Sequence, residues 1–348
     1  MIAVLTAVRD AGSLKQAADR LGRSYRHLWG QLHEWEAALG APLVSWSRGS
    51  RARLTEFAER LLWAELRARK RMQPHIEALR AHLEQALAEA HAETPMLLRL
   101  CASHDLALPM LRSFAARRGL GIELLTQGSI DALRSLNAGR CLVAGFHVPA
   151  LAGAAPDFAR ALKPLLRPGQ HKLIGCSRRT QGLMLRHEHA GLVVEAGDIA
   201  ASGLRFVNRQ VGSGTRLLMD HWLREGGVAA SQITGYDDAI EESHVALAAT
   251  IASGAADIGP GVEAAALEFG LHFVPLVGED YFLACLKEQL DRPEVVHLRD
   301  LLASPDWAAV LASLPGYTPA RAPGAVLAMT GELPWWRFAR RKASAAAG

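Results

Sequence analysis

Residues 11–46 read AGSLKQAADRLGRSYRHLWGQLHEWEAALGAPLVSW, and residues 52–62 read ARLTEFAERLL. Two helical patterns of apolar residues follow one another here, over Leu14–Leu21 and Tyr25–Leu39, each directly after a serine and directly before a glycine. Serine is favoured before the first turn of a helix, and glycine is favoured after the last. A short helix, a tight turn and a longer helix predict a helix-turn-helix, in which the second helix enters the major groove of DNA.

A short β-hairpin with a basic tip is predicted after the second of these helices. Leu43–Trp46 and Arg51–Leu54 have the composition of strands, and Gly49 lies in the turn between them. Residues 1–54 hold eight Lys and Arg against four Asp and Glu, so this short segment carries a charge of +4. Contact with DNA phosphates requires a basic surplus of this kind.

The side chains that we expect at DNA lie at the helix starts and along the hairpin. Arg26 is the best candidate for a base contact, because an arginine can donate to O6 and N7 of one guanine. Arginines near the hairpin tip suit the DNA backbone or the minor groove. The full expected set is Ser13, Lys15, Arg23, Ser24, Tyr25, Arg26, His27, Arg48, Arg51 and Arg53.

The N-terminal region resembles the winged helix-turn-helix of the molybdate-responsive, ModE-type regulators and is more distantly similar to that of the LysR type. The resemblance implies an all-α, winged helix-turn-helix DNA-binding domain, which we place at residues 1–60. The alternative is an ordinary helical bundle that binds a protein partner. The resemblance covers about residues 1–70 and rests on Gly12-Ser13-Leu14 with Ala17-Ala18, Ser24-Tyr25 with Trp29, and Leu54-Thr55.

Residues 61–94 are predicted to form a connecting helix that pairs two chains. Its apolar residues recur at spacings of three and four, which is typical of a coiled-coil seam. A homodimer, or a higher even oligomer, would present two helix-turn-helix units to a near-palindromic operator. The alternative is a helix that packs only on its own chain, and Pro74 predicts a kink or break near Gln73. The seam consists of Ile76, Leu79, Leu83, Ala86 and Ala90.

Residues 95–330 alternate apolar runs, glycine-bearing turns and helical segments, which indicates an α/β domain. Three predicted strands, Met96–Cys101, Ile122–Thr126 and Cys141–Val148, end at or beside polar side chains. In open α/β sheets the ligand lies at the carboxyl ends of the strands. We therefore expect a ligand edge where polar groups from neighbouring strands converge.

A glycine-rich turn, GSGTR at Gly212–Arg216, is the sharpest motif of this domain. It follows a predicted strand, Leu204–Arg209, and precedes an amphipathic helix. Glycine lets backbone N–H groups converge on an anion, and the helix dipole adds positive potential. No lysine follows the glycines, so a Walker-type nucleotide loop is disfavoured.

The ligand-binding residues that we expect come from both halves of this domain. For His244 a solvated position on its helix is an equal alternative. The expected set is Ser103, His104, Asp105, Ser129, His147, Asn208, Arg209, Ser213, Gly214, Thr215, Arg216, Tyr236 and His244.

These motifs resemble the periplasmic-binding-protein-like domains that follow ModE-type helix-turn-helix modules or are fused to molybdopterin-biosynthesis enzymes. The resemblance covers about residues 97–316 and rests on SHD, AGFH, RFVNRQ, GSGTR and IASGAADIG. It implies a two-lobed α/β domain of the type II periplasmic-binding-protein-like fold that closes on a ligand. The effector that it implies is molybdate, tungstate or a molybdopterin-type compound, and no cofactor is certain.

Several classes of protein are disfavoured. The four cysteines are isolated, so no metal site is expected. No apolar run is long enough to cross a bilayer and no signal peptide is recognised, so we expect a cytoplasmic protein with no membrane partner. No nucleophile elbow of the GxSxG kind is present, so we do not expect an enzyme.

The sequence predicts a ligand-responsive, one-component transcriptional regulator that binds operator DNA as a homodimer and senses a small anionic effector. The alternative is a small-molecule-binding protein, or an enzyme, with a helical accessory domain. The expected parts are the DNA-binding domain at 1–60, the linker helix at 61–94, the effector domain at 95–330 and a basic, aromatic tail at 331–348.

Overall fold

Two compact units make up the chain, Met1–Met72 and Gln73–Gly348. Helix α4 (Glu56–Ala90) continues as one α-helix through Pro74, so the break predicted there does not occur. The strong helix formers on both sides outweigh the backbone hydrogen bond that proline removes. Among the described residues, no helix is both long enough and apolar enough to cross a membrane. The computed structural model describes residues 1–47, 51–90, 96–150 and 155–336.

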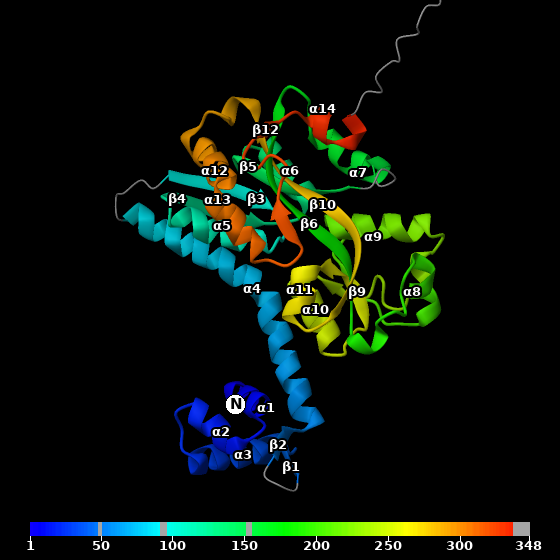
Figure 1. Cartoon of the computed structure of the whole chain (residues 1–348). Coiled ribbons are helices and arrows are strands. Elements are labelled where there is room, and N and C mark those ends of the chain that lie inside the picture. The colour runs from blue at the N-terminus through cyan, green and yellow to red at the C-terminus, as the bar shows by residue number, and fades with distance from the viewer. Residues whose placement is uncertain (48–50, 91–95, 151–154, 337–348) are drawn as a thin grey trace, which may run out of the picture. The chain divides into compact units, whose positions relative to one another are not determined.

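The first unit is a helix-turn-helix followed by a β-hairpin (Figure 1). Helix α2 (Leu14–Arg20) begins after Ser13, whose hydroxyl accepts a bond from a backbone N–H in the first turn. Ser24 caps α3 (Tyr25–Leu39) in the same way. These are the caps that the sequence predicted. The other elements are α1 (Ile2–Ala11), β1 (Val44–Ser47), β2 (Arg51–Leu54) and the start of α4.

Apolar side chains from every element of this unit meet in one core. Leu5 of α1, Leu28 and Leu32 of α3, and Leu43 before β1 are all completely or almost completely buried. Burying one such side chain stabilises a fold by about 1.5–3 kcal/mol. The core holds α3 at a fixed angle to its neighbours and leaves the opposite face of the helix to solvent.

The second unit is an α/β domain with two lobes. In the first lobe, strand β3 (Met96–Ala102) lies between two parallel neighbours, β4 (Leu120–Thr126) and β5 (Val143–Pro149). Helices cover both faces of this sheet (Figure 1). One face packs on α5 (Ala107–Ala116), α12 (Pro293–Ala303) and α13 (Pro305–Ala312), and the other on α6 (Ser129–Asn137), α7 (Ala155–Leu162) and α14 (Met329–Glu332).

Two long antiparallel strands, β6 (His171–Leu185) and β10 (His272–Leu286), connect the lobes. Leu173 near the start of β6 packs in the first lobe, whereas Leu183 near its end packs in the second. The middle of both strands therefore lies between the lobes, where Arg179 of β6 is in register with Glu279 of β10. Short strands β11 (Tyr317–Pro319) and β12 (Val326–Leu327) pair with β6.

The second lobe packs helices around β9 (Ile258–Val262) and the far ends of the crossing strands. The strand predicted over Leu204–Arg209 is reduced to β7 (Asn208–Arg209), because the N–H of Arg205 bonds to a side chain instead of a neighbouring strand. The predicted two-lobed α/β fold behind a helix-turn-helix is confirmed. The remaining elements are α8 (Ala196–Ser202), α9 (Gly214–Glu225), β8 (Ile240–Glu241), α10 (His244–Ala252) and α11 (Glu263–Glu268).

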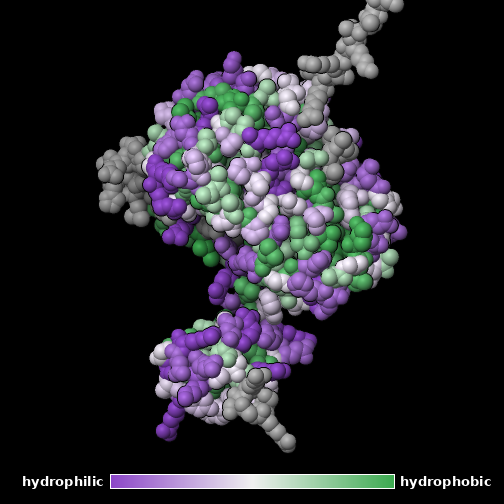
Figure 2. All heavy atoms as spheres, viewed as in Figure 1, coloured by the Kyte–Doolittle hydropathy of each residue, from purple (hydrophilic) through white to green (hydrophobic). Residues whose placement is uncertain are grey.

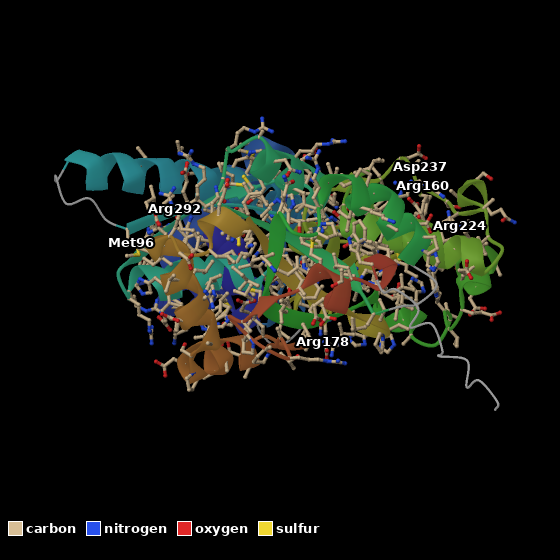
Figure 3. The ribbon with its side chains drawn as sticks, turned by 90° about the horizontal axis from the view of Figure 1, so that it is seen from above. Met96, Arg160, Arg178, Arg224, Asp237 and Arg292 are labelled. Atoms are coloured by element: carbon tan, nitrogen blue, oxygen red, sulfur yellow. The ribbon has the colours of Figure 1, made fainter. Side chains whose placement is uncertain are left out.

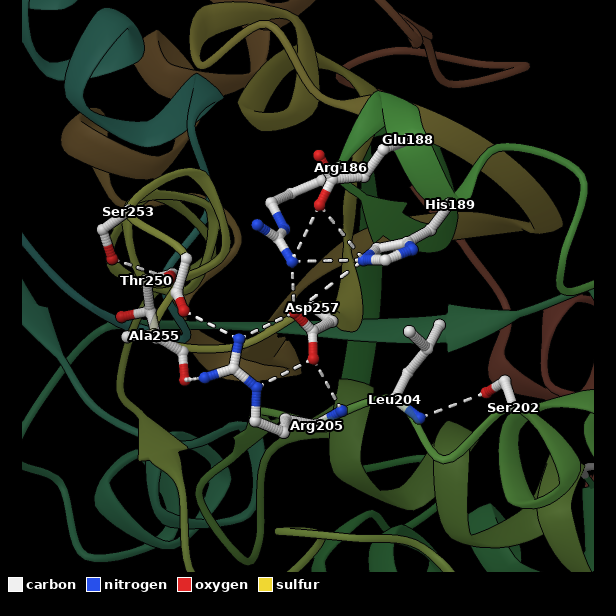
Figure 4. Close-up of polar contacts among 11 residues, drawn as sticks. Arg186, Glu188, His189, Ser202, Leu204, Arg205, Thr250, Ser253, Ala255 and Asp257 are labelled. Atoms are coloured by element: carbon white, nitrogen blue, oxygen red, sulfur yellow. Dashed lines mark hydrogen bonds and ion pairs between the residues drawn. The ribbon is translucent and has the colours of Figure 1, made fainter.

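An ion-pair network ties together three segments of the second lobe (Figure 4). Arg205 donates to both carboxylate oxygens of Asp257, at 2.9 and 2.8 Å. Arg186, directly after β6, donates to the same carboxylate at 2.6 Å. The hydrogen bond from Arg205 lowers the pKa of Asp257 to about 2, against the effect of burial.

We expect Asp257→Asn to lower the free energy of unfolding by about 2 kcal/mol, because it leaves two guanidinium groups without their shared carboxylate. For a domain of this size that loss corresponds to a fall in Tm of roughly 4–8 °C, measurable by calorimetry. The pKa of Asp257 is depressed in the fold, so its stabilisation is complete above the ordinary aspartate pKa and is lost as the pH falls toward 2. The control is Asp131→Asn, which breaks an exposed ion pair with Arg134. It is expected to leave Tm within about 1–2 °C of that of the wild type. An equal effect of both substitutions contradicts the prediction.

Candidate functional site

Polar side chains of the first lobe face the glycine-rich turn of the second. Ser129 opens α6 and His147 lies in β5, and both are buried. A Cβ atom added to Gly214 at the start of α9 would lie 3.9 Å from the His147 Cβ and 4.0 Å from the Ser129 hydroxyl. One added to Gly128 would lie 3.4 Å from the carbonyl oxygen of Gly212. The glycine-rich turn therefore lies close to the first lobe at this place.

Three of the expected residues form a hydrogen-bonded series inside the first lobe. The Ser103 hydroxyl lies 3.2 Å from Nδ1 of His147, and Nε2 of His147 lies 3.1 Å from Oδ2 of Asp105. Burial alone raises the pKa of Asp105, but the hydrogen bond from His147 and the charge of Arg179 bring it down to about 2. Burial, aided by Arg179, lowers the pKa of His147. At neutral pH the series is thus a serine, a neutral imidazole and a carboxylate.

The crossing strands add a buried ion-pair cluster to this series. Arg179 donates to Oδ2 of Asp105 at 2.8 Å and to Oε2 of Glu279 at 2.9 Å. Burial opposes its charge, yet Glu279, Tyr317 and Asp105 together raise the pKa of Arg179. The Tyr317 hydroxyl donates to Asp105 at 3.1 Å. The carboxylate of Asp105 is therefore engaged by protein groups, and it positions His147 and Arg179.

Arg209 is a buried charged group with unused hydrogen-bond donors, although the charges of three glutamates, Glu242, Glu241 and Glu279, favour its charged form. Its side chain is buried in the second lobe, and only Nη2 has a partner, the carbonyl oxygen of Glu242 at 2.7 Å. Within the described part of the chain, Nε and Nη1 have no hydrogen-bond acceptor. Burial and the charge of Arg179 lower the pKa of Arg209 to about 9, so the guanidinium stays charged at pH 7. Unused donors on a buried guanidinium are the kind of group to which anions bind in proteins.

Burial and the positive charge of Arg209 also lower the pKa of two further histidines, His104 and His244. Burial, followed by the charge of Arg209, lowers the pKa of His104 to about 4. The same two causes lower the pKa of His244 well below its ordinary value. Nδ1 of His244 has no partner among the described residues, and its ring is buried at the start of α10. Both rings are thus neutral at pH 7 and bring no charge to the site.

Several other expected ligand residues have their polar atoms engaged within the protein. Asn208 bonds the N–H of Arg209 and the carbonyl of Tyr236, and the Tyr236 hydroxyl donates to Asp220. Arg216 donates to Asp220 at 2.9 Å and also pairs with Asp237. Ser213 caps α9, and Gly214 and Thr215 are the first two residues of that helix and are buried. The start of α9 faces the first lobe at Gly214. The first N–H groups of a helix have no partner within it, so this helix start can donate hydrogen bonds there.

The expected DNA-binding residues lie on the first unit. Ser13 and Ser24 use their hydroxyls as helix caps. The side chains of Lys15, Arg23, Tyr25, Arg26, His27 and Arg53 are exposed, and Figure 2 shows hydrophilic residues over much of the visible face of this unit. Arg23 donates to Gln31 at 2.8 Å. Arg48 and the side chain of Arg51 lie outside the described residues.

Comparison with known families identifies both parts of the chain. Residues 111–303, more than half of its length, match the family described as PBP superfamily domain. The chain belongs to the PBP superfamily. Residues 1–59 match the family of bacterial regulatory helix-turn-helix proteins of the lysR type. The chain thus joins a LysR-family helix-turn-helix to a PBP-superfamily domain, and the LysR likeness, which the sequence motifs placed second, is the one supported.

Relatives of this PBP-superfamily chain include proteins without an assigned function. It is 30% identical over 191 residues to the uncharacterized protein YvgK of Bacillus subtilis (strain 168), a match that spans 55% of this chain and only 61% of YvgK. It is also 34% identical over 102 residues to an uncharacterized Clostridium pasteurianum protein from the 5′ region of a ferredoxin 2Fe-2S gene. That match covers 29% of this chain and 89% of the other protein.

Two solved structures also match this chain over most of its length, at low sequence identity. A mutant OxyR of Corynebacterium glutamicum has a TM-score of 0.43 at 16% identity, over 90% of this chain and 94% of that one. Full-length CbnR in complex with its target DNA has a TM-score of 0.42 at 17% identity, over 86% and 98%.

Three buried residues of the PBP-superfamily domain, Arg179, Gln181 and Glu279, were missed in the sequence. They lie in the middle of β6 and β10, between the lobes. The signal for them was the polar run RRTQ, Arg178–Gln181, inside an otherwise apolar strand. A charged side chain remains in such a strand only if a partner or a ligand compensates it. Among the described residues, no group of three His, Cys, Asp or Glu is arranged to hold a metal ion.

A polar latch also joins the two lobes, away from the glycine turn. Asp157 of α7 accepts from His221 at 3.1 Å and pairs with Arg224, and both partners belong to α9. Arg160 approaches the same carboxylate, and Figure 3 shows Arg160 and Arg224 together at one end of the unit. Helix α7 packs in the core of the first lobe, and α9 packs Leu218 in that core and Met219 in the core of the second lobe. The latch therefore fastens to the first lobe a helix that both lobes share.

We expect Asp157→Asn to weaken anion binding by about 3- to 10-fold, because part of the free energy of closure is lost. The affinity for sulfate and phosphate, measured by calorimetric titration, checks this. Asp306→Asn, which breaks a pair with Arg118 inside the first lobe, is the matched control and is expected to bind as wild type does. Unchanged affinity in Asp157→Asn would show that the latch does not act on closure.

Proposed function

We propose that this chain is a transcriptional regulator whose binding to operator DNA depends on an effector held between the lobes of its PBP-superfamily domain. The observation that carries the proposal is Arg209, a buried cation with two unused N–H groups, in a chain that begins with a regulatory helix-turn-helix. Effector binding favours closed lobes, and a closed form with a different affinity for DNA couples the two sites. The protein then acts in the cytoplasm, where the operator is.

The effector that we propose is a small anion. Support comes from the unused donors of Arg209, the start of α9 and the unpartnered hydroxyl of Ser129, all on the facing surfaces of the lobes. Helix starts and guanidinium groups are the features that bind oxyanions in proteins. Molybdate, tungstate and a molybdopterin-type compound are the candidates that the sequence motifs favour.

We further propose that α4 pairs two chains into a homodimer. Ile76, Leu79 and Leu83 are each more than half exposed, and they lie on one stripe of the helix. An apolar stripe of this kind on a single chain is typical of a coiled-coil seam. We expect Leu79→Glu to convert the dimer to monomer, as measured by sedimentation at micromolar protein, while the nearby exposed substitution Arg80→Glu leaves it intact.

The test of the proposed function is binding of the purified full chain to its own promoter region. Fluorescence anisotropy over a salt series is expected to show specific binding that weakens steeply as salt rises. A panel of anions, first screened by the rise in Tm that they cause, is expected to change that affinity. Absence of DNA binding, or binding that no anion alters, rejects the proposal.

An enzyme is the second candidate, because Ser103, His147 and Asp105 lie at the distances of a nucleophile, a base and an orienting carboxylate. In such a reaction the Ser103 oxygen attacks an ester carbonyl while His147 takes its proton and passes it to the departing alcohol. Water then hydrolyses the acyl-serine, which releases the acid and restores the Ser103 hydroxyl. Reaction with a fluorophosphonate probe that disappears in Ser103→Ala supports this candidate. A wild-type protein that the probe leaves unmodified excludes it.

A further inference from the structure

The wall of the site formed by the first lobe offers hydrogen-bond acceptors to a ligand. The carboxylate of Asp105 can only accept, so Nε2 of His147, 3.1 Å away, carries the ring proton. Nδ1 of this neutral ring is then bare and accepts from the Ser103 hydroxyl at 3.2 Å. Because the only proton of that hydroxyl is used, Ser103 presents lone pairs, and no donor, to the space between the lobes.

Glu279 adds an acceptor to the same wall. Its Oε2 is bonded to Arg179, but its Oε1 is buried and has no donor within the described residues. Gln181, two residues from Arg179 along β6, has both its amide oxygen and its amide nitrogen buried without partners. Leaving a buried carboxylate oxygen without a donor is unfavourable, so a ligand that brings a donor is favoured there.

The opposite wall, formed by the second lobe, offers donors. Nε and Nη1 of Arg209 are unused, and the first N–H groups of α9 point out of the helix start. The field of Glu279 reaches Arg209, which places the two walls of the site within electrostatic range of each other. Positive charge and donors are thus concentrated at Arg209 and the start of α9, whereas the acceptors are Ser103 and Glu279. The Ser129 hydroxyl and the Gln181 amide nitrogen are further donors without partners among the described residues.

We propose that the effector is an anion that carries its own hydrogen-bond donor, with its charge at Arg209 and its donor at Ser103 and Glu279. A protonated oxyanion, a hydroxy acid and an anion with ring N–H groups all have this chemistry, whereas a fully deprotonated tetrahedral oxyanion lacks it. The inference rests on the function proposed above and narrows its effector class. Molybdate and tungstate carry no proton at pH 7, so among the candidates it favours the molybdopterin-type compound.

The test compares probes that share shape and charge type but differ in one donor. Phosphate is compared with sulfate, and glycolate with acetate, by calorimetric titration of the whole chain described here at pH 7. Phosphate and glycolate are each expected to bind at least 10-fold more tightly than their partners. Equal or tighter binding of sulfate and acetate, or no binding of any of the four probes, overturns the inference.

Two variants test which residues cause the preference for phosphate over sulfate. Ser103→Ala removes one acceptor without changing charge and is expected to reduce the preference for phosphate over sulfate at least 3-fold, with sulfate affinity unchanged. Glu279→Gln replaces the acceptor by an amide that can donate and is expected to raise the affinity for sulfate relative to phosphate. Ser113→Ala, an exposed serine of α5, is the matched control. A phosphate preference that survives in Ser103→Ala at full size overturns the assignment even if Glu279→Gln fails to fold.

Operator binding in the same samples separates this inference from the proposed function. If the protein binds its promoter and sulfate alters the affinity as strongly as phosphate does, the regulator stands and the donor inference fails. If phosphate binds more tightly than sulfate but DNA is not bound, the inference on ligand chemistry stands and the proposed regulator fails.

Discussion

Replacing Arg209 with methionine is expected to abolish the response of DNA binding to anions while leaving the DNA affinity of the anion-free protein unchanged. Methionine fills much of the same space but has neither the charge nor the two unused N–H groups. Loss of a buried charge-assisted contact costs about 2–5 kcal/mol, which corresponds to a drop in anion affinity between roughly 30-fold and several thousand-fold. Calorimetric titration with phosphate and sulfate measures it.

The stability of Arg209→Met distinguishes loss of a ligand contact from loss of the fold. Removing the guanidinium relieves its desolvation but also loses the attraction of nearby glutamates and the bond to the Glu242 carbonyl, so Tm is expected to stay close to that of wild type. Arg134→Gln, on the exposed side of α6, is the control and is expected to keep wild-type anion affinity. An Arg209→Met protein that binds anions normally would remove the main support for the proposed site.

The second large effect is expected at Arg26, where alanine substitution should weaken specific operator binding by about 10- to 100-fold. Arg26 is exposed in the first turn of α3, the position from which the second helix of the motif reaches base edges. A bidentate contact from arginine to guanine is worth about 1–3 kcal/mol of discrimination. Anisotropy with the operator and with a shuffled duplex measures affinity and specificity together.

The pattern of losses in Arg26→Ala identifies what the side chain contacts. A base contact predicts that binding to the shuffled duplex changes little, whereas a phosphate contact lowers both affinities and reduces the salt slope by about 1. Arg292→Ala, an exposed arginine of the second unit, is the control and is expected to bind DNA as wild type does. Wild-type operator affinity in Arg26→Ala argues against α3 as the recognition helix.

The helix-turn-helix was readable from the sequence because its determinants are local. Ser13 and Ser24 cap the helices three residues before the N–H groups that they bind, and the buried leucines recur at helical spacing. Pro74 shows the limit of such rules: of the kink or break predicted there, the break does not occur, since α4 continues through Pro74 as one helix. The kink stays a prediction.

The candidate ligand site was readable only in part. Ser103, Ser129 and His147 were found because strand ends in an α/β sheet share one edge. That Asn208, Tyr236 and Arg216 bond within the protein was not visible, because their partners depend on how the second lobe packs. Their role toward a ligand stays a prediction.

The sequence by itself determined the helix-turn-helix, its caps and basic face, and the alternation of strands and helices in the effector domain, because each follows from contacts between residues a few positions apart. Only the tertiary structure decided which polar groups meet between the lobes. Arg179 lies 100 residues from Glu279, and the pairing of two long strands brings these two together. It lies 74 residues from Asp105, which follows β3 and meets Arg179 only through the packing of the first lobe. Whether a buried donor is satisfied or left for a ligand depends on all its neighbours in space, and no local pattern encodes that.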